Sequence, residues 1–433
     1  MKNHRPYPAY KPTGLAWLPE VPREWEMLRG KFLFTKMERP VRPQDEVVTC
    51  FRDGEVTLRK NRRLEGFTES LKEIGYQGVR KGDLVIHVMD AFAGSVGVSD
   101  SDGKSTPVYS VCVPKKSGIN NYYYAHIVRV MAKTGYIQSL YRGIRERSSD
   151  FRFEVFGNQF LPIPPPAEQE AIVAYLDEKT AKIDRLIELK EREIKLLNEK
   201  KQAVISKVVT RGLDPNAELV DSGVDWIGKV PRGWRMSKLS YRYSVQLGKM
   251  LNASRFKGDY AVPYLRNQDV QWDSVNTVDL PLMDIKPEER ERFSAKEGDL
   301  LLCEGGEIGR CCVWEKKEIV YFQKAIMRLR PHERTMDCVR YLWHLLRAAS
   351  AHSAFVNATG KATIAHLPAE KLSAARLPFP PLSEQREIVA YLDAEGAKTD
   401  KAIAAVARQI GLLKEYRTRL ISDAVTGRID LRG

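Results

Sequence analysis

The stretch LPIPPPAEQEAIVAYLDEKTAKIDRLIELKEREIKLLNEKKQAVISKVVTRGLD, residues 161–214, occurs twice in this chain. Shifted by 216 residues, it aligns without a gap with LPFPPLSEQREIVAYLDAEGAKTDKAIAAVARQIGLLKEYRTRLISDAVTGRID, residues 377–430, and about half of the positions are identical. A period of this length is far too long for a solenoid or a propeller. The repeat therefore indicates two tandem copies of a whole structural module.

Each copy opens with a proline run that cannot be helical and continues with a helical pattern. We expect Ser383 to cap the second helix, with Glu384 in the first turn, and the poorer cap Ala167 to start the first helix. Gly212 and Gly427 lie where C-terminal caps belong. Each helix carries one apolar stripe, formed in the first copy by Ile172, Leu176, Ile183, Ile187, Ile194, Leu197, Val204 and Val208 and in the second by Ile388, Leu392, Ile403, Val406, Ile410, Leu413, Leu420 and Ala424.

About 40 residues at 1.5 Å each make a helix of roughly 60 Å, which would leave its apolar stripe in water unless it has a partner. The simplest partner is the other copy. We therefore expect an intramolecular coiled coil, antiparallel because a globular domain separates the two helices. The alternative is a pair of ordinary surface helices, each packed on its own core.

Composition bounds the rest of the chain. With 433 residues, 43% hydrophobic and 29% charged, the sequence has room for two or three soluble domains. Neither a signal peptide nor a membrane-spanning run of apolar residues is visible, so we expect a cytoplasmic protein. The six cysteines include no CxxC pair and the seven histidines form no cluster with ligand spacing, so we expect no metal site and reduced cysteines.

The net charge of +14 indicates a polyanionic partner, with nucleic acid as the first candidate. An anionic membrane surface would require a basic amphipathic helix with bulky aromatics on its apolar face. The long helices are too mixed in charge for that.

A second, shorter repeat precedes each globular part: GLAWLPEVPREWEM at residues 14–27 matches GVDWIGKVPRGWRM at residues 223–236. We expect its tryptophans to anchor a connector on the adjacent domain. The predicted segments are a connector at 1–28, a globular domain at 29–160, a proline entry and long helix at 161–214, a second connector at 215–237, a second globular domain at 238–376, and a second proline entry and helix at 377–433.

Both globular domains mix short β-branched runs with glycine punctuation, which predicts an α+β fold. The sequences Lys81-Gly82-Asp83-Leu84 and Glu297-Gly298-Asp299-Leu300 occupy the same place in the two domains, which otherwise share little. The expected strands lie at 46–51, 83–88, 108–113, 262–266, 299–303 and 325–329, and the expected helices at 122–133 and 339–349.

No catalytic site or cofactor site is visible. Gly103-Lys104-Ser105 lacks the glycine that a phosphate-binding loop needs five residues earlier, and residues 304–310 are rich in glycine but do not form GxGxxG. Asp102 and Lys104 match two positions of a nuclease motif, a match expected by chance in so charged a chain.

Basic and amide side chains on expected loops are the candidates for DNA contacts, because guanidinium groups pair with phosphates or guanine edges and amides with adenine. Each one taken alone could equally be a solvated loop residue. The candidates are Arg59, Lys60, Arg62, Arg63, Arg142, Arg145, Arg147, Ser254, Arg255, Lys257, Arg266, Asn267, Gln268, Lys361 and Thr363.

The duplicated segments PPAEQ at 165–169 and PPLSEQ at 380–385, together with the tryptophan connectors, resemble the specificity subunits of type I restriction-modification enzymes. The resemblance covers essentially the whole chain. In the second domain it includes 262–267, 298–302, 305–309 and 323–328, whereas the first domain has 90–97 in place of the glycine-rich loop.

This resemblance implies a DNA reader without catalysis of its own: two target recognition domains joined by two long antiparallel helices, each domain reading half of a split double-stranded target. It implies that two modification subunits and, through them, restriction subunits dock on the chain, that S-adenosylmethionine, ATP and magnesium act on those other subunits, and that the host is prokaryotic. Docking candidates on the repeated segments are Glu168, Gln169, Tyr175, Glu384, Gln385 and Tyr391.

Two other classes of function remain open from the residues. A single-chain nuclease or methyltransferase would need a hidden metal or cofactor site. A coiled-coil scaffold would bind DNA without sequence preference. The target sequence is not readable from the chain, because base recognition depends on loop geometry and DNA shape.

Overall fold

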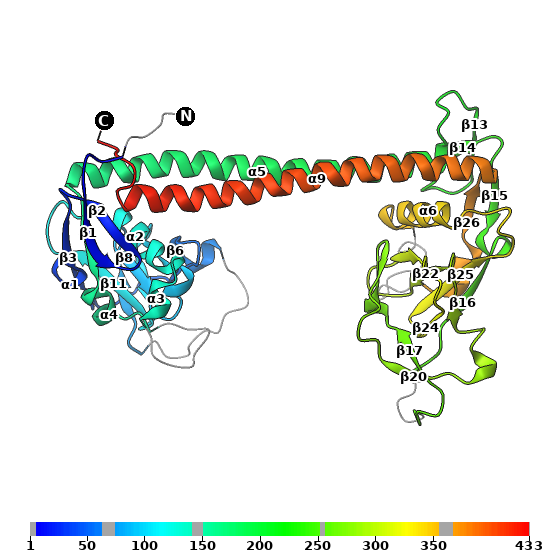
Figure 1. Cartoon of the computed structure of the whole chain (residues 1–433), viewed down its shortest axis with the longest axis horizontal. Coiled ribbons are helices and arrows are strands. Elements are labelled where there is room, and N and C mark those ends of the chain that lie inside the picture. Colours follow the sequence, from blue (N-terminus) through cyan, green and yellow to red (C-terminus); the bar gives the residue numbers. More distant parts are fainter. Residues whose placement is uncertain (1–5, 63–73, 141–149, 252–255, 355–366, 433) are drawn as a thin grey trace. The chain divides into compact units, whose positions relative to one another are not determined.

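The computed structural model describes residues 6–62, 74–140, 150–251, 256–354 and 367–432. The chain divides into two compact units, unit 1 with Met1–Lys190 and Arg408–Gly433, and unit 2 with Glu191–Ala407. Both boundaries fall inside the long helices α5 (Pro166–Arg211) and α9 (Leu382–Val425), drawn in green and red-orange in Figure 1. Each unit therefore contains one part of each long helix.

The centre of unit 1 is an antiparallel four-stranded sheet in the order β4-β11-β8-β9. Its strands are β4 (Phe34–Lys36), β8 (Leu84–His87), β9 (Val96–Val98) and β11 (Tyr109–Pro114). Helix α2 (Asn121–Lys133) packs against β8 and β9. Val85 and Val111 of the central strands pack with Val48 and Val56 of a neighbouring hairpin, which explains their apolar runs.

The remaining elements of unit 1 are short. Its hairpins and two-stranded ladders are β1 (Tyr10–Leu15) with β2 (Leu18–Pro22), β3 (Glu26–Arg29) with β12 (Phe160–Ile163), β5 (Val48–Cys50) with β6 (Val56–Leu58), and β7 (Gln77–Val79) with β10 (Gly103–Ser105). Its short helices are α1 (Gly30–Leu33), η1 (Arg59–Asn61), η2 (Ala91–Ala93), α3 (Tyr136–Ser139) and α4 (Phe153–Asn158).

Unit 2 contains two four-stranded sheets. The first has the order β16-β25-β22-β23, with β16 (Tyr243–Leu247), β22 (Leu300–Cys303), β23 (Cys311–Val313) and β25 (Ile326–Pro331), and α6 (Val339–Ala351) packs on β23. The second has the order β20-β17-β24-β21, with β17 (Ala261–Leu265), β20 (Leu282–Asp284), β21 (Ser294–Ala295) and β24 (Val320–Phe322).

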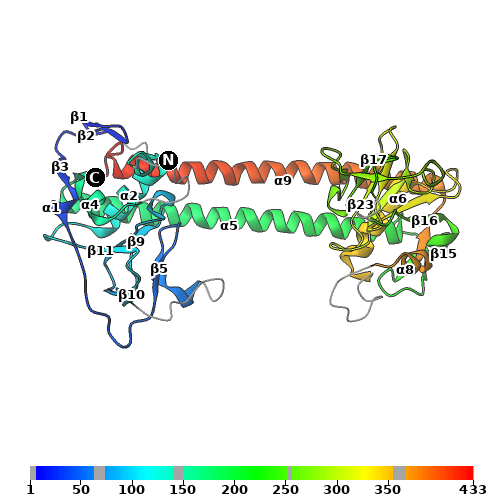
Figure 2. The same ribbon diagram turned by 90° about the horizontal axis from the view of Figure 1, so that it is seen from below.

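Short elements complete unit 2 (Figure 2). The two-stranded ladders are β13 (Leu219–Asp221) with β14 (Lys229–Pro231), β15 (Arg235–Lys238) with β26 (Arg376–Phe379), and β18 (Val270–Gln271) with β19 (Ser274–Val275). The short helices are η3 (Leu239–Tyr241), η5 (Asn267–Asp269), η6 (Pro287–Glu289) and α8 (Ala369–Ala374).

The two units share more than their sequences predict. The order β4-β11-β8-β9 in unit 1 matches the order β16-β25-β22-β23 in unit 2, strand for strand along the chain. The repeated Gly-Asp-Leu sequence enters β8 and β22, and its aspartate is buried in both units. Asp83 binds the guanidinium of Arg39, and Asp299 binds that of Arg330 at 2.7 and 2.8 Å. The expectation that the domains share little beyond this sequence is thus wrong for the central sheet.

The long helices begin earlier than predicted. The backbone N–H groups of Glu168 and Gln169 donate to the carbonyl of Pro165, and the N–H of Gln385 donates to Pro381, so α5 starts at Pro166 and α9 at Leu382. Proline suits the first helical position because its missing N–H has no partner there. Ser383 and Ala167 are therefore helical residues, which corrects the predicted caps. Gly212 follows α5 with φ +71°, as expected for a C-terminal glycine; Gly427 lies two residues beyond the last residue of α9 with φ +75°.

Every residue of the predicted apolar stripes on α5 and α9 is buried or half-buried. In unit 1 the hydroxyl of Tyr123 on α2 donates to the carbonyl of Val425 at 2.8 Å. In unit 2 the hydroxyl of Tyr341 on α6 lies 3.1 Å from the carbonyl of Val209. The globular domain of unit 1 is thus hydrogen-bonded to the C-terminal end of α9, and that of unit 2 to the C-terminal end of α5.

The predicted strands and shorter helices are confirmed to within a few residues. The cysteines are free thiols, five of them buried. Among the described residues, no helix is both long and apolar enough to span a membrane.

Candidate nucleic-acid interface

The loop after β17 in unit 2 holds three of the predicted DNA contacts, but only one side chain is exposed. Asp269 is buried and receives hydrogen bonds from the backbone N–H of Arg266 at 2.8 Å and from its guanidinium at 2.8 and 2.9 Å. Burial opposes ionisation of Asp269, yet these hydrogen bonds outweigh it and lower the pKa of the carboxyl. Arg266 is therefore engaged in shaping the loop.

Asn267 is also turned inward. Its Nδ2 donates to the carbonyl of Gly305 at 3.0 Å, and its own carbonyl accepts from Arg310 at 2.9 Å. These bonds tie the loop to the glycine-rich segment between β22 and β23. Gln268 is exposed between these two internal contacts and is the amide on this loop that is free to reach a base edge.

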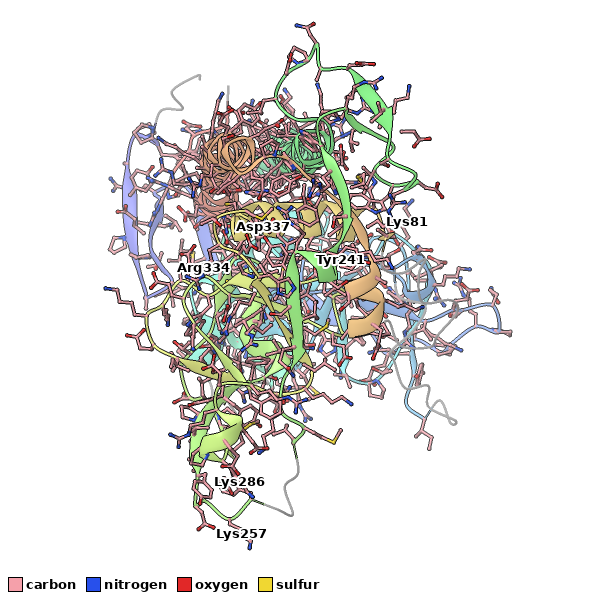
Figure 3. The ribbon with its side chains drawn as sticks, turned by 90° about the vertical axis from the view of Figure 1, so that its right-hand side faces the viewer. Lys81, Tyr241, Lys257, Lys286, Arg334 and Asp337 are labelled. Atoms are coloured by element: carbon pink, nitrogen blue, oxygen red, sulfur yellow. The ribbon has the colours of Figure 1, made fainter. Side chains whose placement is uncertain are left out.

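A basic and aromatic tip lies at the β17–β20 side of unit 2. The carboxylate of Asp284 accepts from the backbone N–H groups of Lys257, Gly258 and Tyr260 at 2.7, 3.0 and 3.0 Å, which lowers its pKa. The side chains of Lys257 and Lys286 are both exposed at this tip (Figure 3).

The aromatic members of this tip are Phe256 and Tyr260, 48% and 42% exposed. Exposed cations interleaved with aromatic rings are the usual surface for a nucleic-acid strand. Sequence reasoning found Lys257 but missed Phe256, Tyr260 and Lys286. The basic–aromatic alternation around residue 257 was the available signal for the two rings, while Lys286 is brought in by the strand pairing alone.

The basic run of unit 1 lies on η1, directly after the β5–β6 hairpin. Lys60 pairs with Glu46 at 2.5 Å, and Arg62 pairs with Asp53 and Glu55 at 2.8 and 2.6 Å while its guanidinium lies 4.2 Å from the centre of the Phe51 ring. Arg59 lies 3.5 Å from the Thr49 hydroxyl through Nε. These pairs are largely exposed and contribute little to stability, so a phosphate could replace the carboxylates at small cost.

Eight of the predicted DNA contacts lie in parts of the chain that the structure does not describe. The other DNA candidates lie outside the described residues: Arg63, Arg142, Arg145, Arg147, Ser254, Arg255, Lys361 and Thr363. Asp102 lies directly before β10 and Lys104 within it, and the carboxylate of Asp102 accepts from the Lys81 N–H at 3.0 Å. Among the described residues, no group of three His, Cys, Asp or Glu side chains could hold a metal ion.

The Glu-Gln pair at the start of α5 is internal. Glu168 is buried and accepts from the Trp25 indole N–H at 3.2 Å and from the Tyr7 hydroxyl. Gln169 has no exposed surface; it accepts from the N–H of Asn120, at the start of α2, and donates to the carbonyl of Pro164, both at 2.9 Å. The pair therefore connects the tryptophan connector, the globular domain and the long helix.

The pair at the start of α9 makes corresponding contacts in unit 2. Glu384 accepts from the Trp234 indole at 3.0 Å. Gln385 is fully buried, accepts from the N–H of Cys338 at 2.8 Å and donates to the carbonyl of Pro380 at 2.9 Å. Burial corrects the prediction that Glu168, Gln169 and Gln385 dock other subunits, because their polar groups are used inside the fold. Tyr175 is half-buried and Tyr391 is exposed, so docking through them stays a prediction.

Replacing Gln385 by leucine should destabilise unit 2 by about 2–4 kcal/mol, because it leaves the half-buried N–H of Cys338 and the buried carbonyl of Pro380 unpaired. Gln169→Leu should do the same in unit 1. Urea unfolding measures the loss, and hydrogen exchange should show faster exchange at the Cys338 amide. Gln409→Leu is the control, since Gln409 is an exposed glutamine of the same helix. Equal stability of Gln385→Leu and Gln409→Leu would contradict the assignment.

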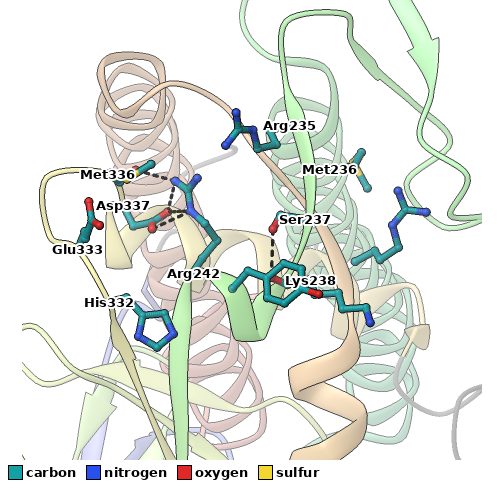
Figure 4. A pocket seen from close by; sticks show the side chains of 11 residues that line it. Arg235, Met236, Ser237, Lys238, Arg242, His332, Glu333, Met336 and Asp337 are labelled. Atoms are coloured by element: carbon teal, nitrogen blue, oxygen red, sulfur yellow. Dashed lines mark hydrogen bonds and ion pairs between the residues drawn. The ribbon is translucent and has the colours of Figure 1, made fainter.

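A pocket of about 520 Å³ opens beside the β15–β26 ladder of unit 2 (Figure 4). Arg235, Lys238 and Arg376 line it, together with the guanidinium of Arg242, which is held by Asp337 at 2.9 Å. Asp337 neutralises Arg242, but Arg235, Lys238 and Arg376 remain as cations, so this is a second basic surface of unit 2. Sequence reasoning missed it because residues 235–242 and 376 are distant in the chain.

Part of this chain matches a known protein family. Residues 231–407 match the family of the type I restriction modification DNA specificity domain. The specificity subunit of the type I restriction enzyme MjaVIII from Methanocaldococcus jannaschii is 26% identical over 243 residues, which are 54% of this chain and 53% of that protein. The chain thus spans about half the length of this curated relative.

Two solved structures are similar in fold. One, from work on complex assembly and conformational transition of the type I R-M system, has a TM-score of 0.69 and 17% identity and covers 94% of this chain and 98% of that one. The HsdS subunit from Thermoanaerobacter tengcongensis has a TM-score of 0.56 and 19% identity, with the same coverage of both chains.

Proposed function

We propose that this chain is a type I restriction-modification specificity subunit that reads a bipartite DNA target without catalysing any reaction itself; the match of residues 231–407 to the DNA specificity domain supports this. The observation that carries the proposal is the shared frame of the two units. Each has the same four-strand order and the same Gln-to-domain and Tyr-to-helix hydrogen bonds. Two domains that share a central sheet but differ in their surface residues could each recognise a different half of one target.

The reading surfaces in this proposal are the β17–β20 tip with Gln268 in unit 2 and the η1 region in unit 1. Lys257, Lys286 and Lys60 would hold phosphates and set the register, while Gln268 would contact a base edge. The net charge of +14 supports a salt-dependent contribution of phosphate contacts to affinity.

The long helices would form an antiparallel coiled coil that fixes the unread spacer between the two half-sites. Ion pairs between the helices support antiparallel pairing within each unit: Asp184 with Arg417 at 2.8 Å in unit 1, and Lys201 with Asp400 at 2.6 Å in unit 2. The inward apolar stripes of α5 and α9 supply the seam.

The partners in this proposal are two modification subunits, one for each copy of the repeated segment, and restriction subunits bound through them. S-adenosylmethionine would be used on the modification subunits, and ATP and magnesium on the restriction subunits. The half-buried Tyr175 and the exposed Tyr391 occupy equivalent positions on α5 and α9 and are the proposed docking contacts. A duplicated chain offers such a partner two equivalent sites.

The purified chain should bind duplex DNA but neither cleave nor methylate it when magnesium, ATP and S-adenosylmethionine are supplied. Gel analysis and methyl-group incorporation measure both reactions, and addition of the modification subunit should restore methylation. Turnover by the chain alone, lost when its own residues are changed, would favour a nuclease or methyltransferase. Binding to DNA without sequence preference even in the complex would favour a scaffold.

A further inference from the structure

Unit 1 contains a cavity of about 640 Å³ between α2 and the C-terminal part of α9. Fourteen residues line it; six of them are lysines or arginines and two are carboxylates. A volume of this size is typical of sites for small ligands. Figures 1 and 2 both draw α2 beside the red end of α9, and the hydrogen bond from Tyr123 to Val425 fixes their contact.

Arg129 of α2 is the central cation of this cavity. It is half-buried, and among the described residues no carboxylate or carbonyl lies within hydrogen-bonding reach of its guanidinium. The guanidinium lies against Gly54, where the lack of a side chain makes room for it. Burial lowers the pKa of Arg129 and the nearby charge of Arg417 lowers it further, while the charge of Asp53 offsets only part of this effect.

The lining cations outnumber the two lining carboxylates, Glu415 and Asp423. Asp423 is shared by Arg419 and Arg428 at 3.3 and 3.5 Å, and Asp184 is taken by Arg417. His126 is neutral near pH 7, because burial and the charges of Arg129 and Arg417 lower its pKa to about 4. Lys133 lies one turn beyond Arg129 on the same face of α2.

Unit 2 provides an internal comparison. Its helix α6 repeats the sequence Tyr-x-x-His-x-x-Arg of α2, with His344 and Arg347 at the places of His126 and Arg129. There the histidine binds Asp393 of α9 at 3.0 Å, and the guanidinium of Arg347 lies 5.3 Å from the ring of Trp343. In unit 2 the histidine therefore has a carboxylate partner and the arginine is covered by an aromatic ring.

In unit 1 the corresponding partners are missing. Asp177, the counterpart of Asp393, makes no ion pair with His126 within the described part of the chain, and Ala125 replaces Trp343. The smaller side chain leaves space beside Arg129, and the missing aromatic ring leaves its cation uncovered.

We propose that this cavity of unit 1 binds a phosphate group, with Arg129 as its bidentate partner and Lys133 as a second cation. A guanidinium fork matches two phosphate oxygens, and the anion would replace the solvation that Arg129 lost on burial. The phosphate could belong to a DNA strand or to a free phosphorylated molecule. Only the first source depends on the proposed DNA-reading function.

Pyrophosphate binding to the full-length chain tests the site directly. Isothermal titration at constant ionic strength should show saturable binding, and Arg129→Gln should weaken it about tenfold or more, as expected for loss of a charge-assisted pair. The matched control is Arg347→Gln, because Arg347 is the unit 2 counterpart of Arg129 and its guanidinium lies over the ring of Trp343. This variant should leave pyrophosphate binding unchanged. Because Arg129→Gln removes an unpaired charge, it should keep its far-ultraviolet circular dichroism. Lys133→Gln, on the solvent-exposed side, gives a second and smaller loss should Arg129→Gln fail to fold.

Titration of a duplex of about 30 base pairs at several salt concentrations identifies the source of the phosphate. Weaker duplex binding by Arg129→Gln, with a salt dependence reduced by about one phosphate contact, assigns the site to DNA. Unchanged duplex binding with lost pyrophosphate binding assigns it to a free phosphorylated molecule. Pyrophosphate binding that is absent from the wild-type chain, or equal in wild type and Arg129→Gln, overturns the proposal. In that case, duplex binding by the wild-type chain would still support the proposed DNA-reading function, so the two failures can be told apart.

Discussion

Inserting four residues into each long helix should lengthen the unread spacer of the DNA target by one or two base pairs and leave both half-sites unchanged. Four residues add about 6 Å to a helix, and duplex DNA advances about 3.4 Å per base pair. The insertions must match. The ion pair between Asp184 and Arg417 shows that Leu189 on α5 and Leu412 on α9 lie at the same height along the helix pair. Both leucines are exposed, so the two insertions are placed there.

The phase of the apolar stripe provides the control for this insertion. Four residues nearly complete a helical turn, whereas two residues rotate everything beyond them by roughly 200° and turn the stripe to solvent. A two-residue insertion at the same sites should therefore abolish the folded helix pair and all methylation in the complex. Sequencing of methylated sites in cells that carry each variant reads out both results. An active four-residue variant with an unchanged spacer would mean that the helices do not set the distance.

Exchange of residues 238–376 for the corresponding domain of another specificity subunit should change one half of the target completely and leave the other half intact. The two ends of the exchanged segment are directly paired, since Lys238 lies opposite Arg376 in the β15–β26 ladder. A new domain would therefore enter and leave through one pair of neighbouring residues. The Trp234–Glu384 hydrogen bond and both long helices remain outside the exchange.

The reciprocal exchange of residues 29–160 is the matched control. Arg29 lies opposite Phe160 in the β3–β12 ladder, so unit 1 has the same kind of junction. This exchange should change the other half of the target only. A change in both halves after either exchange would show that the domains do not read independently.

The helices were predictable from the sequence because their signals are local. The stripe spacing identified the inward residues, and the glycine after α5 marked its end. The start of α5 was misplaced because Pro166 resembles a helix breaker, although its position in the first turn makes it a good first residue. The shared strand order was missed because it depends on pairing between distant segments, such as β4 with β11, which have different sequences in the two domains.

The candidate site was less predictable, for a physical reason. A basic residue contacts DNA readily only if the fold leaves its charge free or pairs it weakly at the surface, and tertiary pairing decides that. Arg266 is taken by Asp269, and Asn267 is taken by the glycine-rich segment, while Lys286 is exposed beside Lys257 although nothing in its local sequence distinguishes it. The Glu-Gln pairs were recognisable as a repeated motif, but their structural role became visible only through contacts with Trp25 and Trp234.

The most direct test of two-part DNA reading is the methylated motif that this chain specifies together with its modification subunit. Single-molecule sequencing of DNA from cells that express both should reveal one motif with two defined halves separated by unspecified bases, and no methylation when this chain is omitted. A single uninterrupted motif, or methylation that persists without the chain, would contradict the account.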